Sequence, residues 1–346
     1  MATMSNDAIE IVPYSEAVAD AHVRFAERMW PMKRRRREDL YNRWKFRGPK
    51  SGSVDGLLVA VSAGDVLGQL GLIPADLDVG GTRMRCQWAC DLMVDTSRRR
   101  RGIGSLLFEA AMTRGIVTLG SNPSAAADAT MQRIGFRPVT GPAIAVFPLD
   151  PTHALSWKLP AKLAALGTPL ATLISPALRW RGRRMLGDAA PSEREVTHGT
   201  WNDVAPLVQA RQRRSPRPHI VHDDRFLAWR CDGLPGFVEA LSTIRGGGVG
   251  YAIVGAGSPY YYVYDWGADS WDEFISVFAA VARAAIDARA MTIQVYAAAD
   301  EDREWLRRAG FLFLRQRCQI LCHPPERLLP AHSEMDYSIF DSDGNL

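Results

Sequence analysis

A short apolar segment, a basic turn with two glycines and an amphipathic segment follow one another in residues 92–111. Leu92, Met93 and Val94 form an apolar run that ends before Asp95, which is typical of a short buried strand. Beyond the turn, apolar side chains recur at the spacing of one helical face: Ile103, Leu106, Leu107, Ala110 and Ala111. The sequence therefore predicts a strand, a tight turn and a helix, in that order.

The turn has the composition of an anion-binding loop. Four arginines, residues 98–101, precede Gly102 and Gly104, where the missing Cβ lets the backbone come close to a ligand. The first amides of a helix have no partner within the helix, and the helix dipole favours negative charge there. A diphosphate is the kind of anion that such a corner holds. The alternative is an arginine run on a solvated loop beside an ordinary helix cap.

Other phosphate-binding motifs do not fit this turn. The dinucleotide fingerprint needs a third glycine where this chain has Leu107, and no Gly-Lys-Ser/Thr sequence follows. The arrangement Arg99-x-x-Gly102-x-Gly104 instead resembles the acyl-CoA signature of the GNAT superfamily of N-acyltransferases. The resemblance implies acetyl-CoA or another acyl-CoA as cosubstrate, with its diphosphate held by main-chain amides of the turn. It places these residues at the cosubstrate: Arg99, Arg100, Arg101, Gly102, Ile103, Gly104 and Ser105.

The expected order of elements also resembles a GNAT domain. Strands are expected at residues 56–62, 66–73, 84–94 and 116–122, with the helix from Gly104 between the last two. A shorter helix then runs into Ile134-Gly135-Phe136, and a last strand covers residues 143–147. We therefore expect an α+β fold, with a mixed sheet between helical layers (α/β/α) and a parallel strand–helix–strand unit at its centre.

An internal repeat predicts a tandem duplication. Asp39-Leu40-Tyr41-Asn42-Arg43-Trp44-Lys45 returns as Asp224-Arg225-Phe226-Leu227-Ala228-Trp229-Arg230, and Arg133-Ile134-Gly135-Phe136 returns as Arg308-Ala309-Gly310-Phe311. We expect an N-terminal GNAT domain in residues 1–150 and a degenerate GNAT-like copy in residues 196–346. At the place of its phosphate turn, residues 264–271 of the second copy carry acidic side chains and tryptophans, so this copy should not bind CoA.

The segment between the copies, residues 151–195, is expected to form short helices that pack across both domains. Its apolar residues are interrupted by Pro160, Pro169 and Pro176. A membrane-surface helix is the alternative, and the prolines argue against it because they break any continuous apolar face.

The chemistry of acyl transfer assigns roles to a few more residues. Backbone N–H groups near Met93 and Val94 would polarise the thioester carbonyl if the strand bulges there. Asp91, a carboxylate in an apolar strand beside that point, is the first candidate for the base; a strand-end Asp that accepts backbone hydrogen bonds is the alternative. Asn122 could orient a water or the pantetheine arm, or be an ordinary turn residue. The family often has a tyrosine where this chain has Met131, so the general acid is unassigned.

Other polar residues have two interpretations each. His219 and His222 precede the second copy of the repeat and could reach a cleft between the domains, or be surface or structural residues. Asp341 and Asp343 could form an acidic rim that binds an amine, or be solvated residues of the tail.

Composition is that of a globular chain. Of the 346 residues, 47% are hydrophobic and 23% charged, and this length suits two domains. The net charge of +4 comes from local basic clusters without interleaved aromatic residues, which fit phosphate-bearing small ligands better than nucleic acid. No run is apolar and long enough for a membrane span, and the N-terminus lacks the pattern of a secretory signal.

Cysteine usage indicates a reducing compartment, and we expect a cytoplasmic protein. The five cysteines are an odd number, which argues against a disulfide framework. The pairs Cys86/Cys90 and Cys318/Cys322 lie in apolar, strand-like runs, so we expect packed thiols and no metal site.

These features predict an enzyme, an acyl-CoA-dependent N-acyltransferase that acts on a primary amine of a small molecule. An amino sugar is the leading hypothesis for the acceptor, by analogy with similar tandem proteins of amino-sugar and polysaccharide biosynthesis. One alternative is a non-catalytic acyl-CoA sensor or assembly module, which Met131 and the degenerate second copy favour. The other is a nucleic-acid-binding protein that uses its arginine clusters.

Overall fold

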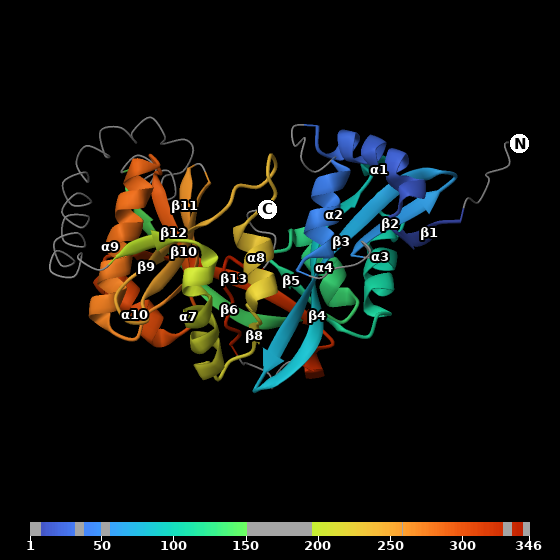
Figure 1. Ribbon diagram of the computed structural model, residues 1–346. Helices are drawn as coiled ribbons and strands as arrows, with labels where there is room; N and C mark the ends of the chain where they lie inside the picture. The colour runs from blue at the N-terminus through green and yellow to red at the C-terminus, as the bar shows by residue number, and fades with distance from the viewer. Residues whose placement is uncertain are drawn as a thin grey trace, which may run out of the picture.

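The computed structural model describes residues 8–31, 38–49, 56–150, 196–257, 259–327 and 334–341. The expected interdomain helices of residues 151–195 and the acidic residue Asp343 lie outside the described residues. Within them, the strands form one mixed sheet with helices on both faces (Figure 1). The predicted α+β architecture is confirmed.

The first copy follows the order expected from the sequence. Its elements are β1 (Glu10–Pro13), α1 (Glu16–Met29), α2 (Asp39–Arg47), β2 (Leu57–Ser62), β3 (Asp65–Val79), β4 (Thr82–Val94), η2 (Thr96–Arg98), α3 (Ile103–Met112), β5 (Val117–Ser121), α4 (Ala125–Arg133) and β6 (Arg137–Pro148). β3 and β4 form one long antiparallel hairpin around Gly80-Gly81, so β3 is longer than expected. β4 and β5 are parallel and joined by α3, which is the predicted strand–helix–strand unit.

The second copy repeats this arrangement. Its elements are β7 (Thr197–Gly199), α7 (Trp201–Arg214), β8 (His219–Ile220), α8 (Asp224–Cys231), β9 (Ser242–Arg245), β10 (Tyr251–Gly257), β11 (Tyr260–Gly267), α9 (Trp271–Asp287), β12 (Thr292–Ala297), α10 (Asp300–Arg308), β13 (Leu312–His323) and η5 (Pro325–Arg327). β11 and β12 are parallel and joined by α9, as β4 and β5 are joined by α3. The tandem duplication is therefore present in the fold.

The two copies exchange their last strands. β13, the last strand of the second copy, lies between β5 and β6 and is antiparallel to both. β6, the last strand of the first copy, pairs on its other side with β12. Figure 1 shows β6 and β13 running side by side between the two lobes. Each half of the sheet is therefore completed by a strand from the other half.

The helices divide between the two faces of the sheet. α1, α2, α7 and α8 contribute to one core cluster that spans both copies, through side chains such as Phe25, Phe46, Val204 and Phe226. α3 with α4, and α9 with α10, form separate clusters on the opposite face. Successive side chains of a strand point to opposite faces of the sheet. In β13, accordingly, Ile320 belongs to the shared cluster and Leu321 to the cluster of α3 and α4.

The repeated sequence block lies at the junction of the copies. Trp44 of α2 and Trp229 of α8 occupy the same position in the two blocks, and their rings are 5.5 Å apart. Trp229 Nε1 donates a hydrogen bond of 3.2 Å to the backbone oxygen of Trp44. The duplicated helices thus contact each other through their equivalent tryptophans.

Candidate functional site: the glycine turn and the fork of the first copy

The predicted phosphate turn lies at the N-terminus of α3. Gly102 precedes the helix in the left-handed region, with φ 78°, and its carbonyl accepts the first helical hydrogen bond, from Leu106. The helix therefore offers no acceptor for the amides of its first three residues, Ile103, Gly104 and Ser105. Among the described residues, a Cβ added at Gly102 would meet no atom within 4 Å, and one at Gly104 would meet only Leu92 Cδ2, at 3.9 Å. The corner is open, as an anion site requires.

Side-chain hydrogen bonds hold the loop before the turn. Asp95 accepts hydrogen bonds from the amide and hydroxyl of Ser97, at 3.0 and 2.7 Å, and Arg28 of α1 lies 3.3 Å from its other oxygen. The hydrogen bonds from Ser97 lower the pKa of Asp95. The four arginines of residues 98–101 are exposed around this ordered loop. They are positioned to add positive charge to the corner.

β4 and β5 separate next to the turn. Their parallel pairing runs from Cys86↔Val117 to Ala89↔Gly120, after which β4 continues to Val94 paired with β3 but not with β5. We call the point of separation the first fork. The pairing of β4 with β3 also changes register there, between Cys90 and Met93, and Asp91 has a φ of 48°. This β-bulge at Asp91 and Leu92 lies immediately before Met93 and Val94, the residues expected to polarise a carbonyl.

A buried polar network surrounds the bulge. Gln69 of β3 donates a hydrogen bond of 3.3 Å to the backbone oxygen of Asp91, and its own oxygen lies 2.8 Å from His22 Nε2. Lys45 Nζ of α2 lies 2.6 Å from Asp91 Oδ2, and the two side chains are 0% and 8% exposed. Burial lowers the pKa of His22, so this imidazole is neutral at pH 7. Sequence reasoning missed these three partners; the place of Lys45 in the repeated block was the available signal.

Asn122 follows β5 and ties it to β13. Its side-chain oxygen accepts a hydrogen bond of 3.0 Å from the amide of Gln319, and its nitrogen lies 3.3 Å from Cys318 Sγ. The residue has a φ of 44°. Both ends of the amide group thus contact the strand inserted from the second copy. These contacts favour the alternative stated for Asn122, a structural turn residue.

Met131 packs beneath β5. Its side chain is 2% exposed, and its Cε would lie 2.5 Å from a Cβ on Gly120. A thioether has no proton to donate, so the position that often carries the family's acid is apolar here.

The second copy keeps the fork and loses the anion corner. Pairing of β11 with β12 ends at Val263↔Val295, and β11 shifts register against β10 next to Asp265. At the N-terminus of α9, however, the carboxylate of Glu273 accepts hydrogen bonds from the amides of Val249 and Asp269, at 3.0 and 2.9 Å. A negative side chain thus lies at the helix end that is open in the first copy.

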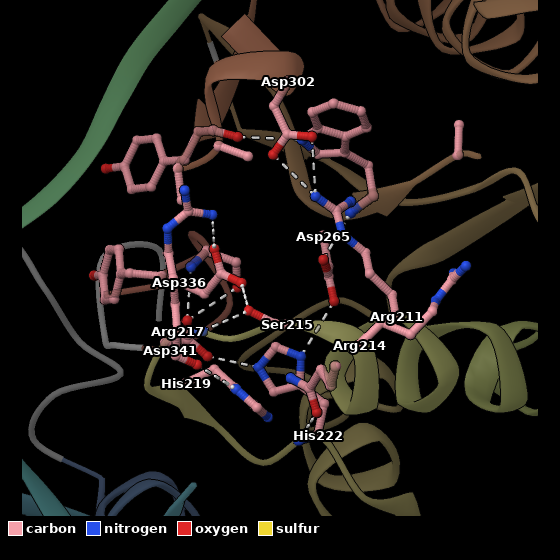
Figure 2. Close-up of a pocket in the computed structure, with 18 of the residues that line it drawn as sticks. Arg211, Arg214, Ser215, Arg217, His219, His222, Asp265, Asp302, Asp336 and Asp341 are labelled. Atoms are coloured by element: carbon pink, nitrogen blue, oxygen red, sulfur yellow. Dashed lines mark hydrogen bonds and ion pairs between the residues drawn. The ribbon is translucent and has the colours of Figure 1, made fainter. Parts of the chain in front are cut away.

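The two histidines singled out by the sequence lie in the second copy. His222 lies between two carboxylates, with Nδ1 3.1 Å from Asp265 Oδ2 and Nε2 2.6 Å from Asp341 Oδ1 (Figure 2). Asp341 is 5% exposed, so it is a buried partner and not a solvated tail residue. His219 contacts the backbone oxygen of Arg217 and is also buried.

The cysteines are free thiols packed in the core. All five are buried. Cys86 and Cys90 of β4, and Cys318 and Cys322 of β13, belong to the shared core cluster. Burial raises the pKa of Cys318 and of Cys322 to about 12, which keeps these thiols protonated at neutral pH.

Comparisons with known proteins agree with this geometry. Residues 10–115 match the sequence profile of an acetyltransferase (GNAT) domain. The GCN5-related N-acetyltransferase from Kribbella flavida is similar in structure, with 15% identity and a TM-score of 0.58 over 91% of this chain and 71% of that chain. The GCN5-related N-acetyltransferase from Anabaena variabilis is similar as well, with 11% identity and a TM-score of 0.60 over 91% of this chain and 72% of that chain. The match with a putative acetyltransferase from Pyrococcus horikoshii covers more of both proteins, 96% of this chain and 92% of that chain, with 13% identity and a TM-score of 0.54. No curated protein sequence matches the chain.

The fold is that of the similar acetyltransferase structures, and residues 10–115 match the sequence profile of a GNAT domain. Over the chain as a whole, two copies of this fold follow one another. Among the described helices, none is apolar over the length that a membrane crossing requires.

Proposed function

We propose that the first copy binds an acyl-CoA at the N-terminus of α3 and transfers the acyl group to a primary amine of a small molecule. The observation that carries this proposal is the open glycine corner beside the bulged strand of the first fork. The amides from Arg100 to Ser105 would hold the diphosphate, and the side chains of Arg99, Arg100 and Arg101 would add charge. The thioester would then enter the fork.

The reaction itself is a direct transfer. A base removes a proton from the ammonium group, and the free amine attacks the thioester carbonyl carbon. Amides at Met93 and Val94 would stabilise the oxyanion that forms. The carbon–sulfur bond then breaks, and the thiolate takes up a proton. The chain's residue for that last proton transfer is unassigned, because Met131 cannot supply it.

Asp91 is the proposed base, and the lysine beside it affects how strong a base it can be. The carboxylate faces the ammonium of Lys45 at 2.6 Å. A neighbouring cation favours the charged form of a carboxylate and so weakens it as a base. Asn122 is proposed to position the end of β5 rather than to contact substrate, since its amide is bound to β13.

A non-catalytic acyl-CoA sensor is the second candidate function. It is favoured by Met131 at the usual place of the acid and by the engagement of Asp91 with Lys45. An amino sugar as acceptor, and acetyl-CoA as the acyl donor, stay hypotheses of the transferase proposal. Release of CoA thiol in the presence of amines separates the two functions.

The test of the site is Gly104→Glu. The added side chain has space, so the fold should be kept, while its charge opposes a diphosphate at the same corner. We expect acetyl-CoA binding, measured by calorimetry, to be lost. Leu106→Glu is the matched control, because it adds the same charge to the same helix at a side chain that is 38% exposed.

Unchanged acetyl-CoA affinity in Gly104→Glu, with native circular dichroism, would remove the turn as the diphosphate site. Binding without CoA-thiol release across a panel of amino sugars, diamines and amino acids would favour the sensor.

A further inference from the structure

The second copy contains a cavity of about 320 Å³ at the position of its own fork (Figure 2). Asp265 lies two residues beyond the last pair of β11 with β12, just as Asp91 lies two residues beyond the last pair of β4 with β5. The walls come from α7, β11, the start of α10 and residues 336–341. The volume is within the range of small-ligand sites, roughly 300–1,000 Å³. The duplication has thus kept a ligand-sized space where the first copy has its transfer site.

The ligand of this cavity is not a CoA diphosphate. In the first turn of α9, the carboxylate of Glu273 already accepts hydrogen bonds from the amide of Asp269, just before the helix, and from the amide of Val249, whereas the first copy has an open glycine corner at this end of its helix. A phosphate placed there would meet a carboxylate that is already bound. The cavity must therefore be assigned from its own side chains.

Charges of both signs line the cavity, with an excess of negative charge. Three arginines of the wall lie beside carboxylates: Arg211 beside Asp302, Arg214 beside Asp269, and Arg217 beside both Asp336 and Glu334, the last of which lies outside the lining. Of the remaining carboxylates in the lining, Glu301 is exposed, and Asp265 and Asp341 share one imidazole. Figure 2 shows this imidazole, His222, between the two aspartates. The other oxygens of these two aspartates accept hydrogen bonds from the neutral amides of Trp266 and Ser338, so even with His222 protonated the pair keeps a net negative charge.

The rest of the wall is aromatic. Six rings line the cavity: Tyr251, Tyr264, Trp266, Tyr296, Trp305 and Tyr337. Aromatic faces attract cations, and they attract them more strongly where water is excluded. Aromatic rings beside a pair of carboxylates with a net negative charge are a suitable environment for an ammonium group and unsuitable for an anion.

We infer that this cavity of the second copy binds a small organic cation that carries at least one ammonium group. Asp265 and Asp341 supply the charge, and the tyrosine and tryptophan rings enclose the carbon chain. The site goes beyond acyl-CoA binding by the first copy and does not depend on it.

One wall of the cavity packs against the first copy. Tyr296 and Tyr337 stack with their rings 5.8 Å apart, and the ring of Tyr337 lies 5.3 Å from that of Trp88 in β4. A bound cation would therefore face residues that contact the first fork. It could be the acceptor amine itself, or an effector that is not acylated.

The test is calorimetric titration of the full chain with spermidine, in the absence of acyl-CoA, with citrate as the anionic probe. We expect spermidine to bind and citrate not to bind. Asp265→Asn should weaken spermidine binding about tenfold, because it removes one charge without changing the shape of the side chain. Asp65→Asn, an exposed carboxylate at the β2–β3 turn, is the matched control and should leave the affinity unchanged.

A second variant fills the space instead of changing the charge. Ala299 lines the cavity and is half-buried, so Ala299→Trp should abolish spermidine binding even if Asp265→Asn does not fold. Gly104→Glu should bind spermidine as the natural chain does, which separates this inference from the acyl-CoA proposal. Citrate binding without spermidine binding, or full affinity in Ala299→Trp, would overturn the inference.

Two further measurements distinguish whether the bound cation is an acceptor or an effector. CoA-thiol release with spermidine as the only amine would make the bound cation an acceptor. A change in KM for another amine, without acylation of spermidine, would make it an effector.

Discussion

At the scale of the residue, two aspartates at equivalent places in the two copies have different partners. Asp91 of the first fork faces Lys45, and Asp265 of the second faces His222. Both carboxylates follow the last pair of a parallel ladder, where a bulge turns the strand. A buried carboxylate requires a compensating charge, and each copy has met that requirement with a different side chain.

The proton on His222 makes stability depend on pH. Burial alone would lower the pKa of His222, but the charge of Asp341 and the hydrogen bonds with Asp265 and Asp341 raise it to about 9. A raised pKa stabilises the folded chain below the ordinary histidine pKa, about 6.5, and this contribution is lost as pH rises through about 9. We expect the free energy of unfolding to fall by about 3 kcal/mol across that interval, measured by urea denaturation.

His222→Gln should flatten the pH dependence of stability between those two values. Equal slopes for the variant and the natural chain would mean that His222 does not carry a proton between Asp265 and Asp341.

At the scale of the element, helix α2 fastens the bulge of β4. Lys45 reaches Asp91 from α2, while Gln69 holds the backbone oxygen of Asp91 from β3. The bulge removes Asp91 from the regular ladder of backbone hydrogen bonds. Gln69 therefore hydrogen-bonds with its backbone oxygen, and Lys45 pairs with its carboxylate. The same helix contacts α8 through Trp44 and Trp229, so the bulge of the first fork is connected to the junction of the copies.

Removing the ammonium of Lys45 should be costly. Lys45→Met leaves the buried Asp91 carboxylate without its cation, which typically destabilises a protein by about 3–5 kcal/mol. We expect a loss of that size in urea unfolding, and partial recovery in the double variant Lys45→Met/Asp91→Asn. If Asp91 is also the base, Asp91→Asn alone should lower turnover while leaving acetyl-CoA affinity unchanged.

The two roles of Asp91 separate in this series. An unaltered rate in Asp91→Asn would remove it as base and leave the structural pair. Additive stability losses in the double variant would contradict the pairing itself.

At the scale of the whole molecule, the strand exchange makes the two copies one structural unit. β13 of the second copy completes the sheet beside β5, and β6 of the first copy completes it beside β12. The shared core cluster contains residues of both copies, from Tyr14 to Phe340. Neither half therefore has a complete sheet or a complete core by its own residues.

We expect neither residues 1–150 nor residues 196–346 to fold alone. The first fragment would expose the edge of β5, and the second the edge of β12, and an unpaired edge promotes aggregation. Circular dichroism and thermal unfolding of each purified fragment should show no cooperative transition, whereas the full chain should unfold in one. A cooperative transition for residues 1–150 by themselves would contradict the exchange as a requirement for folding.

The sequence by itself determined the features that depend on local periodicity and on repetition. The strand, turn and helix around Gly102 and Gly104 follow from neighbouring residues, and the duplication follows from the two Trp-containing blocks. The tertiary structure decided which distant groups meet: Asp91 with Lys45, Asn122 with Gln319, and His222 with Asp341. These partners are separated by 46, 197 and 119 residues, and strand exchange brings a strand of the other copy between β5 and β6. Pairing over such separations depends on the complete packing of the chain, which no local pattern encodes.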